Sequence, residues 1–128
     1  MADNGEVRTI KVAVIDDDRE MIKLVEMILK PQGVDILAAY GGLTGYALVK
    51  REKPDVVLLD IMMPDIDGYE VCRKIKLDPV TSDIPVIFIS ARSGQQHIQQ
   101  GLSLGAQGYL TKPFNPVALR RKVLELAG

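Results

Sequence analysis

Two short apolar runs of the sequence both end in carboxylates. The three aspartates Asp16–Asp18 follow the first run, and Asp60 follows the second. If the two runs are neighbouring parallel strands, their acidic ends meet at one edge of a sheet, where the repulsion between carboxylates must be offset by a cation, a lysine or a shifted pKa. The pattern indicates a metal-assisted carboxylate site, with Lys112 as the candidate lysine and Mg²⁺ as the stronger offset.

Strand-like apolar runs alternate with segments of helical periodicity along the whole chain. Strict alternation of this kind predicts a parallel sheet with helices on both faces. Because no linker or repeat interrupts the alternation, we expect one domain over residues 1–128, with its core at about 9–127. The predicted strands are 9–15, 34–39, 56–60, 85–90 and 108–111, and the predicted helices run over about 19–29, 42–52, 68–76, 93–104 and from 116 onward.

Four of the predicted helices carry capping signals at their start, among them Asp67 with Glu70 for the third and Asn115 before Pro116 for the last. Asp17 or Asp18 is suited to cap the first helix, and Glu20 stands three residues after Asp17, as a capping box requires. Ser93 with Gln96 predicts another capping box for the fourth helix. Capping alone leaves the other acidic strand end unexplained, and one aspartate can serve both as a cap and as a ligand.

Several other residues are expected to have structural roles. Asp65 and Asp67, in the loop after the third strand, are interpreted as turn and cap residues. Leu43, Ala47 and Leu48 are expected to point inward from the second helix, and Leu102 is expected to belong to the apolar stripe of the fourth.

Composition limits the possible functions. With 16 basic and 17 acidic residues, the formal net charge of −1 gives no reason to expect direct binding of nucleic acid or of an anionic membrane. No apolar stretch reaches the roughly 18 residues that a membrane helix needs, and the N-terminal stretch 1–6 is polar, so we expect a cytoplasmic protein. Cys72 and His97 are the only cysteine and histidine, which excludes a disulfide framework and a Cys/His zinc site.

Four motifs make the chain resemble the receiver domain of two-component response regulators. They are Val-Ile-Asp-Asp-Asp at 14–18, Leu-Leu-Asp-Ile-Met-Met-Pro-Asp-Ile-Asp-Gly at 58–68, Ile-Ser-Ala at 89–91 and Gly-Tyr-Leu-Thr-Lys-Pro-Phe at 108–114. The resemblance covers essentially the whole chain. It implies a flavodoxin-like, doubly wound (βα)5 fold whose five-stranded parallel sheet has the order 2-1-3-4-5.

The resemblance also implies a metal site. It makes Asp60 the phosphoacceptor and assigns the metal to Asp16, Asp17, Asp60 and the backbone carbonyl of Met62. Mg²⁺ takes oxygen ligands and commonly binds through one or two carboxylates together with a phosphate oxygen. We therefore expect Mg²⁺ as the cofactor, with Mn²⁺ as a possible substitute.

Further residues are implied to contact the phosphoryl group or to respond to it. Lys112 would bring a positive charge to a phosphoryl oxygen, and Ser90 would act as the switch hydroxyl that moves toward it. Tyr109 would then turn into the space behind Ser90, which changes the face formed by the fourth helix, the fifth strand and the fifth helix. The resemblance also raises the expectation of a cis bond between Lys112 and Pro113 well above the usual frequency of roughly 5–6%.

The resemblance implies partners. We expect phosphoryl transfer from a sensor histidine kinase or a histidine phosphotransfer protein, and readout by a downstream protein or by an output domain absent from this sequence. The protein is expected to be a monomer or a phosphorylation-linked dimer. It would be a phosphoacceptor switch rather than an enzyme, with activity limited to its own phosphorylation and dephosphorylation.

Residues beside the site are expected to set the lifetime of the phosphorylated state. Met62 and Arg92 each stand two residues beyond a site residue, at positions that tune this lifetime in the resembled family. Methionine offers no good donor or acceptor to orient an attacking water, which predicts slow self-dephosphorylation.

Two alternatives stay open. The first is a Mg²⁺-dependent phosphatase with an aspartyl nucleophile, as in haloacid-dehalogenase-like enzymes, although these have a second aspartate where this chain has Met62. The second is a receiver-like interaction module that does not take phosphate. Turnover of small phosphate esters would favour the phosphatase, and failure of Asp60 to react with acetyl phosphate would favour the module.

Overall fold

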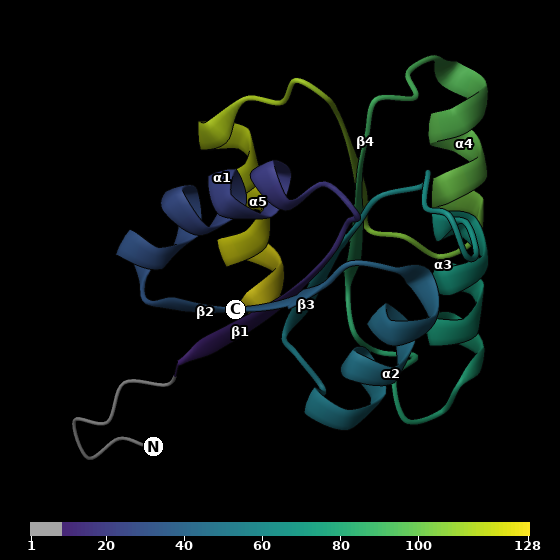
Figure 1. Cartoon of the computed structure of the whole chain (residues 1–128), viewed down its shortest axis with the longest axis horizontal. Coiled ribbons are helices and arrows are strands. Elements are labelled where there is room, and N and C mark those ends of the chain that lie inside the picture. The colour runs from purple at the N-terminus through teal and green to yellow at the C-terminus, as the bar shows by residue number, and fades with distance from the viewer. Residues whose placement is uncertain (1–8) are drawn as a thin grey trace.

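The computed structural model describes residues 9–128, so the polar stretch 1–6 and the first part of the predicted domain lie outside the described residues. Within the described part, strands and α-helices alternate from end to end (Figure 1). The elements are β1 (Ile10–Ile15), α1 (Arg19–Leu29), a 3₁₀ turn (Lys30–Gln32), β2 (Val34–Ala39), α2 (Gly42–Glu52), β3 (Val56–Leu59), α3 (Gly68–Leu77), β4 (Val86–Ser90), α4 (Gln95–Ser103), β5 (Gly108–Thr111) and α5 (Pro116–Ala127).

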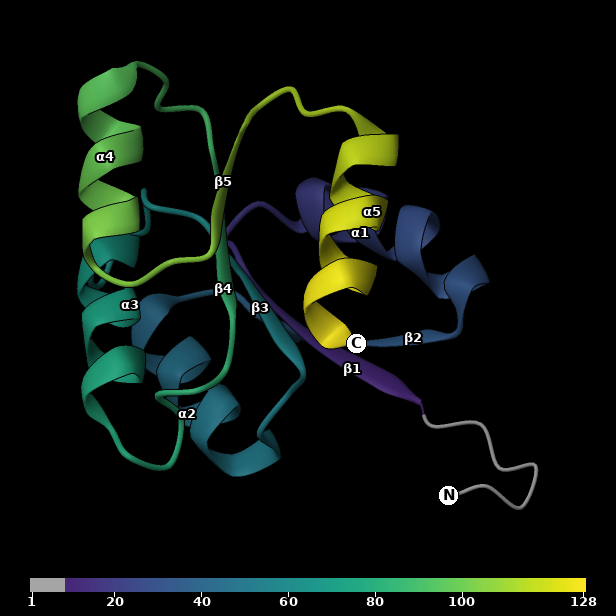
Figure 2. The same cartoon turned by 180° about the vertical axis from the view of Figure 1, so that it is seen from behind.

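The strands form one parallel sheet in the order β2-β1-β3-β4-β5, which confirms the predicted fold class. Helices α1 and α5 cover one face of the sheet, and α2, α3 and α4 cover the other (Figures 1 and 2). β1 lies between β2 and β3 in the sheet. The chain passes from β1 to β2 on one side, and then crosses back to β3 on the other side of β1. This is the switch point of a doubly wound sheet, where ligands bind beyond the carboxyl ends of the strands.

Two apolar cores, one on each face, hold the helices to the sheet. Successive side chains of a strand point to opposite faces, so Val12 and Val14 of β1 pack in the core under α1 and α5. Ala13 and Ile15 pack in the core under α2 and α3. Because all four side chains are at most 2% exposed, the residues that follow β1 are fixed by burial on both faces.

One helix cap is assigned to one of its two predicted candidates, and another predicted cap is wrong. The side chain of Asp18, not of Asp17, accepts hydrogen bonds from two backbone amides in the first turn of α1, at 3.0 and 3.4 Å. The capping box predicted at Ser93 is wrong, since α4 begins after Gly94 without a side-chain cap. Gly94 has a φ of 105°, and this conformation moves the start of α4 one residue past the position that Ser93 would cap.

Burial also differs from expectation in α2 and α4. Leu48 is buried as expected, but Leu43 is 53% exposed and Ala47 is exposed, and Gly45 is buried in their place. A Cβ at Gly45 would meet the side chain of Ile15, so α2 approaches β1 through its glycine face and not through Leu43. Leu102 in α4 is 41% exposed and does not belong to the core.

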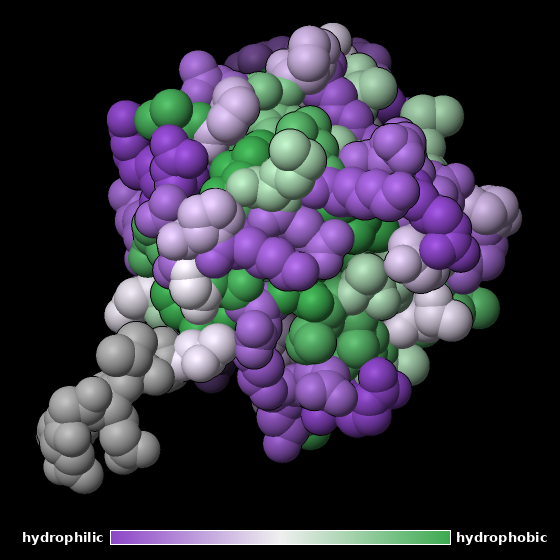
Figure 3. Space-filling model, turned by 60° about the vertical axis from the view of Figure 1, so that its left-hand side comes forward, coloured by the Kyte–Doolittle hydropathy of each residue, from purple (hydrophilic) through white to green (hydrophobic). Residues whose placement is uncertain are grey.

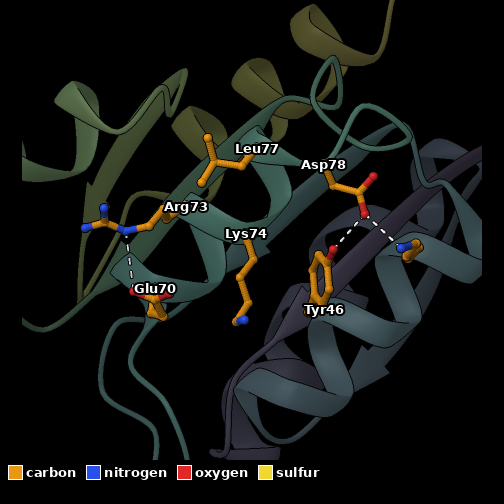
Figure 4. A pocket seen from close by; sticks show the side chains of 7 residues that line it. Tyr46, Glu70, Arg73, Lys74, Leu77 and Asp78 are labelled. Atoms are coloured by element: carbon orange, nitrogen blue, oxygen red, sulfur yellow. Dashed lines mark hydrogen bonds and ion pairs between the residues drawn. The ribbon is translucent and has the colours of Figure 1, made fainter.

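Helices α2 and α3 are joined through one carboxylate at the end of α3. Asp78 Oδ2 accepts a hydrogen bond of 2.7 Å from the hydroxyl of Tyr46 and lies 3.0 Å from Nζ of Lys50, both on α2 (Figure 4). These contacts lower the pKa of Asp78 to about 2, the largest cause being the hydrogen bond from Tyr46. The two helices therefore form one connected layer on their face of the sheet.

The surface mixes hydrophilic and apolar side chains. Figure 3 shows both kinds interspersed on the side that lies to the left in Figure 1. Exposed apolar side chains on α1 include Leu24 and Met27. Among the described residues, no helix is both long and apolar enough to span a membrane.

Candidate functional site

Three carboxylates gather at the carboxyl edge of the sheet. The parallel register pairs Ile15 of β1 with Leu59 of β3, which brings the next residues, Asp16 and Asp60, to the same level. Oxygen atoms of Asp16, Asp17 and Asp60 lie within 4.8 Å of one another. Asp16 and Asp60 are only 3% and 7% exposed, and Asp17 faces solvent.

The backbone holds the two buried aspartates in place. The amide of Asp16 donates to the carbonyl of Ala39 at 3.0 Å, and the amide of Asp60 donates to the carbonyl of Ile15, also at 3.0 Å. These bonds continue the sheet by one residue beyond β1 and β3. The carboxylates are therefore part of a rigid edge and do not hang from a loop.

Lys112 bridges the two buried carboxylates. Its Nζ lies 2.9 Å from Oδ2 of Asp16 and 3.2 Å from Oδ2 of Asp60. Its amide donates to the carbonyl of Ser90 at 2.8 Å, which ties the end of β5 to the end of β4, and the bond between Lys112 and Pro113 is cis. The lysine and the carboxylates come from three strands and meet at one point.

The electrostatics of this point favour an added cation. Burial raises the pKa of Asp16, and the nearby charge of Asp60 raises it further, against the lowering effect of hydrogen bonds from Asp18 and Lys112. Burial alone would lower the pKa of Lys112, but its bonds and attraction to Asp16 and Asp60 outweigh that cost and raise it. One lysine thus faces three carboxylates, which leaves an excess of negative charge.

A hard divalent cation fits this donor set. The oxygen atoms are close enough to share one ion, and Mg²⁺ and Mn²⁺ both take carboxylate oxygens as ligands. The carbonyl of Met62, predicted as a further ligand, belongs to the loop that follows Asp60, and the Met62 side chain is 55% exposed.

Ser90 and Tyr109 lie on the neighbouring strands. The fully buried Ser90 ends β4, and its Oγ accepts a hydrogen bond of 3.2 Å from the amide of Arg92. The Tyr109 hydroxyl donates to the carbonyl of Arg92 at 2.6 Å, and its ring packs on Phe88 with the centroids 5.8 Å apart. Burial raises the pKa of Tyr109. Both side chains thus contact the same segment after β4.

Sequence reasoning missed two contributors to the site. A Cβ at Gly68, the first residue of α3, would overlap the backbone oxygen of Asp60, so only glycine lets α3 approach the end of β3 this closely. The hydrogen bond from the Gly68 amide to the carbonyl of Ile61, at 2.7 Å, closes the loop between them. Gly68 is the last residue of the second sequence motif, but the motif alone did not indicate this contact.

Asp65 is the second missed contributor. It was expected to be a turn residue, but both of its carboxylate oxygens accept backbone hydrogen bonds from α2, at Gly42 and Leu43. No local signal marks a partner more than twenty residues away in the sequence.

The fold and the site together define a class of protein. A flavodoxin-like parallel sheet with carboxylates on its first and third strands and a lysine on its fifth belongs with α/β proteins that bind charged ligands at the switch point. A sequence profile of the response regulator receiver domain matches residues 12–124. The chain belongs to this family, and it is a receiver domain of a two-component system.

Named relatives agree with this membership. The chain is 41% identical to the response regulator PleD of Caulobacter vibrioides over 116 residues, which are 91% of the chain and 26% of PleD. It is 38% identical to the DNA-binding dual master transcriptional regulator RpaA of a Synechocystis species, over 91% of the chain and 48% of RpaA. The chain therefore spans about a quarter to a half of the length of these relatives.

Solved structures agree as well. The beryllofluoride-activated receiver domain of DrrB superposes with a TM-score of 0.81 at 37% identity, covering 93% of this chain and 97% of that one. Receiver domains are signalling switches and not classical enzymes, and the chain shares that class.

Proposed function

We propose that this receiver domain is switched by Mg²⁺-dependent transfer of a phosphoryl group to Asp60. The observation that carries the proposal is the meeting of Asp16, Asp17 and Asp60 around one point, with Nζ of Lys112 bonded to two of them. An acyl phosphate forms when a carboxylate oxygen attacks phosphorus, and little covalent chemistry beyond the nucleophile is needed.

The proposed transfer replaces one bond to phosphorus with another. An oxygen of Asp60 forms the new bond to phosphorus while the bond from phosphorus to the donor nitrogen breaks, and the electron pair of that bond stays on the donor imidazole. Asp16, Asp17, Asp60 and the Met62 carbonyl would hold the metal, which supplies positive charge to the phosphoryl oxygens when it is bound.

The other residues of the site support the transferred group. Lys112 carries a positive charge beside Oδ2 of Asp60, in position to contact a second phosphoryl oxygen. Ser90 is buried at the end of the adjacent strand and offers a hydroxyl donor to a third. Because these groups are already fixed by the sheet, little reorganisation accompanies the transfer.

The signal follows from the added charge. Phosphorylation adds a charge of about −1.5 to −2 and strong acceptor oxygens. Movement of Ser90 toward them would break the bond between its Oγ and the amide of Arg92. Tyr109, bonded to the carbonyl of the same residue, would then turn inward and change the surface formed by α4, β5 and α5.

The partners follow from the same reading. The donor would be a histidine kinase or a histidine phosphotransfer protein, and the changed surface would be read by a protein partner or by an output domain in the same polypeptide. One domain over residues 1–128, a cytoplasmic location and a monomer or phosphorylation-linked dimer remain predictions.

The proposal is tested by the intact mass of the protein after incubation with acetyl phosphate. With Mg²⁺, wild type is expected to gain one phosphoryl group, and Asp60→Asn is expected to gain none. Omission of Mg²⁺ with added chelator should prevent the gain. An equal gain in Asp60→Asn would overturn the assignment of the acceptor, and continuous release of phosphate from small esters would favour a phosphatase.

A further inference from the structure

Helix α2 receives its N-terminal cap from a distant loop. The cap position, Gly41, has no side chain to offer, and no residue of α2 itself caps the helix. Asp65 does so instead: its Oδ1 accepts from the amide of Gly42 and its Oδ2 accepts from the amide of Leu43, both at 2.9 Å. Each oxygen of one carboxylate thus satisfies one free amide of the first turn.

This contact is electrostatically favourable. The hydrogen bonds from Leu43 and Gly42 lower the pKa of Asp65 to about 2, so the carboxylate is ionised at neutral pH. A negative charge at a helix N-terminus also interacts favourably with the helix dipole. The attachment between Asp65 and α2 is therefore charge-assisted at both of its bonds.

The contact lies in the middle of the loop that follows the acceptor. That loop runs from Ile61 to Asp67 and contains Met62. Its far end is fixed, because the Asp67 carboxylate accepts from the amide of Glu70 at 3.0 Å and Gly68 packs against the backbone of Asp60. Asp65 fixes the middle of the loop, and it does so by bonding to α2.

The other end of this connection is rigid. α2 is joined to α3 through Asp78, which bonds Tyr46 and faces Lys50 (Figure 4). The close approach of Gly42 to Ile66 and Val71 packs the start of α2 against the same loop and the same helix. The loop is thus held against a layer of two connected helices.

We infer that Asp65 is a positioning residue for metal binding: by holding the loop to α2, it keeps the backbone carbonyl of Met62 directed at the ion. The inference rests on the proposed function, in which that carbonyl is a ligand. Removal of a residue that contacts and orients a metal ligand commonly lowers metal affinity by 10- to 100-fold.

The experiment measures the Mg²⁺ dissociation constant by titration calorimetry for wild type and Asp65→Ala. Asp65→Ala is expected to bind Mg²⁺ about tenfold more weakly. Asp65→Asn keeps one acceptor oxygen and is expected to fall between the two. If Asp65→Ala does not fold, Asp65→Asn alone tests the inference. Its affinity for Mg²⁺ must then be lower than that of Asp67→Asn, a variant that removes one charge from the same loop.

Two control variants separate positioning from other effects. Asp67→Asn removes one negative charge from the same loop but keeps a good cap, so it reports the effect of charge alone and should change affinity less than about twofold. Asn115→Ala removes a cap that also accepts from two amides, at the start of α5, and reports the effect of lost stability.

The possible outcomes are distinct. If Asp65→Ala binds Mg²⁺ as tightly as Asp67→Asn or Asn115→Ala, Asp65 is only a cap and the inference is wrong, while the proposed function stands. If wild type itself binds no Mg²⁺, the proposed metal site fails and the inference fails with it. A loss of Mg²⁺ affinity in the Asp65 variants but not in the two controls supports both the inference and the proposed metal site.

Discussion

Asp17 differs from the other two carboxylates of the site in its surroundings. Asp16 and Asp60 are buried and bonded to Lys112, whereas Asp17 is exposed and forms no ion pair with another residue in the described range 9–128. Two like charges at this separation repel by about 1 kcal/mol when solvent screens them. If the proposed function is correct, this repulsion is offset only when an ion is bound.

This predicts that Asp17→Asn is more stable than wild type in the absence of divalent ions. The free energy of unfolding, measured by urea denaturation with chelator, should rise by about 0.5–1 kcal/mol because one repulsive charge is removed. Added Mg²⁺ should stabilise wild type more than the variant, since only ions that bind the folded state shift the equilibrium. Lower stability of Asp17→Asn with chelator would contradict this account of the repulsion.

Met62 is expected to control how long the phosphoryl group remains. Its side chain is 55% exposed next to the acceptor and cannot orient water. Met62→Asn introduces a donor and an acceptor there, so the rate of phosphate loss from the phosphorylated protein should rise by about tenfold. The decay of the phosphorylated mass with time measures this rate, and Met63→Asn serves as the neighbouring control. An unchanged lifetime in Met62→Asn would count against the prediction.

At the scale of the elements, the strands were more predictable than the helix faces. β3 is a run of four apolar residues buried on both faces, a pattern that indicates an interior parallel strand directly. The faces of α2 and α4 were not predictable in the same way. Leu43 was expected inside and is exposed, because Gly45 lets α2 approach β1 on another side.

The site also combines contacts that were predictable from the sequence with contacts that were not. Asp16 and Asp60 could be placed together because the ends of neighbouring parallel strands meet at one edge, once the family resemblance had supplied the order of the strands. The attachment of Asp65 to α2 could not be predicted, since it depends on how a loop packs against a helix formed much earlier in the chain. Contacts of this kind become visible only in three dimensions.

The two aspartates that anchor α2 predict a pH dependence. The folded protein holds the pKa of Asp65 and of Asp78 at about 2, below the ordinary value of 3.8. Between these values the unfolded chain binds more protons, so stability rises with pH in this window. The contribution is fully present above about pH 4 and is lost as the pH falls toward 2.

Urea denaturation at several pH values tests this dependence. The free energy of unfolding of wild type should fall as the pH is lowered from about 4 toward 2. The double variant Asp65→Asn/Asp78→Asn should show a shallower fall over the same window, because asparagine does not titrate. If the free energy of unfolding falls equally with pH in the two proteins, these carboxylates are not the source of the pH dependence.

In the whole domain, a change at Asp60 is expected to reach the surface formed by α4, β5 and α5. Tyr109 is the residue that connects them, through its bond to the carbonyl of Arg92 and its ring contact with Phe88. Gly101 in α4 leaves room there, since a Cβ at this position would press on Phe88 and Tyr109. Breaking the bond at Arg92 should therefore change the surroundings of Tyr109.

Fluorine NMR of protein labelled with 3-fluorotyrosine can detect this change. Among the four tyrosines of the chain, Tyr109 is expected to shift most when Mg²⁺ and beryllofluoride are added. Tyr46, which bonds Asp78 on the opposite side of α3, should shift little and serves as the internal control. A Tyr109 resonance that does not move would contradict the proposed route of the signal.

One divalent ion is expected to join Asp16, Asp17 and Asp60. Mn²⁺ takes the same oxygen ligands as Mg²⁺, and in a crystal soaked with Mn²⁺ its position can be measured by anomalous diffraction. We predict one strong anomalous peak within bonding distance of all three carboxylates. A crystal that binds Mn²⁺ elsewhere, with no peak between these residues, would contradict the account.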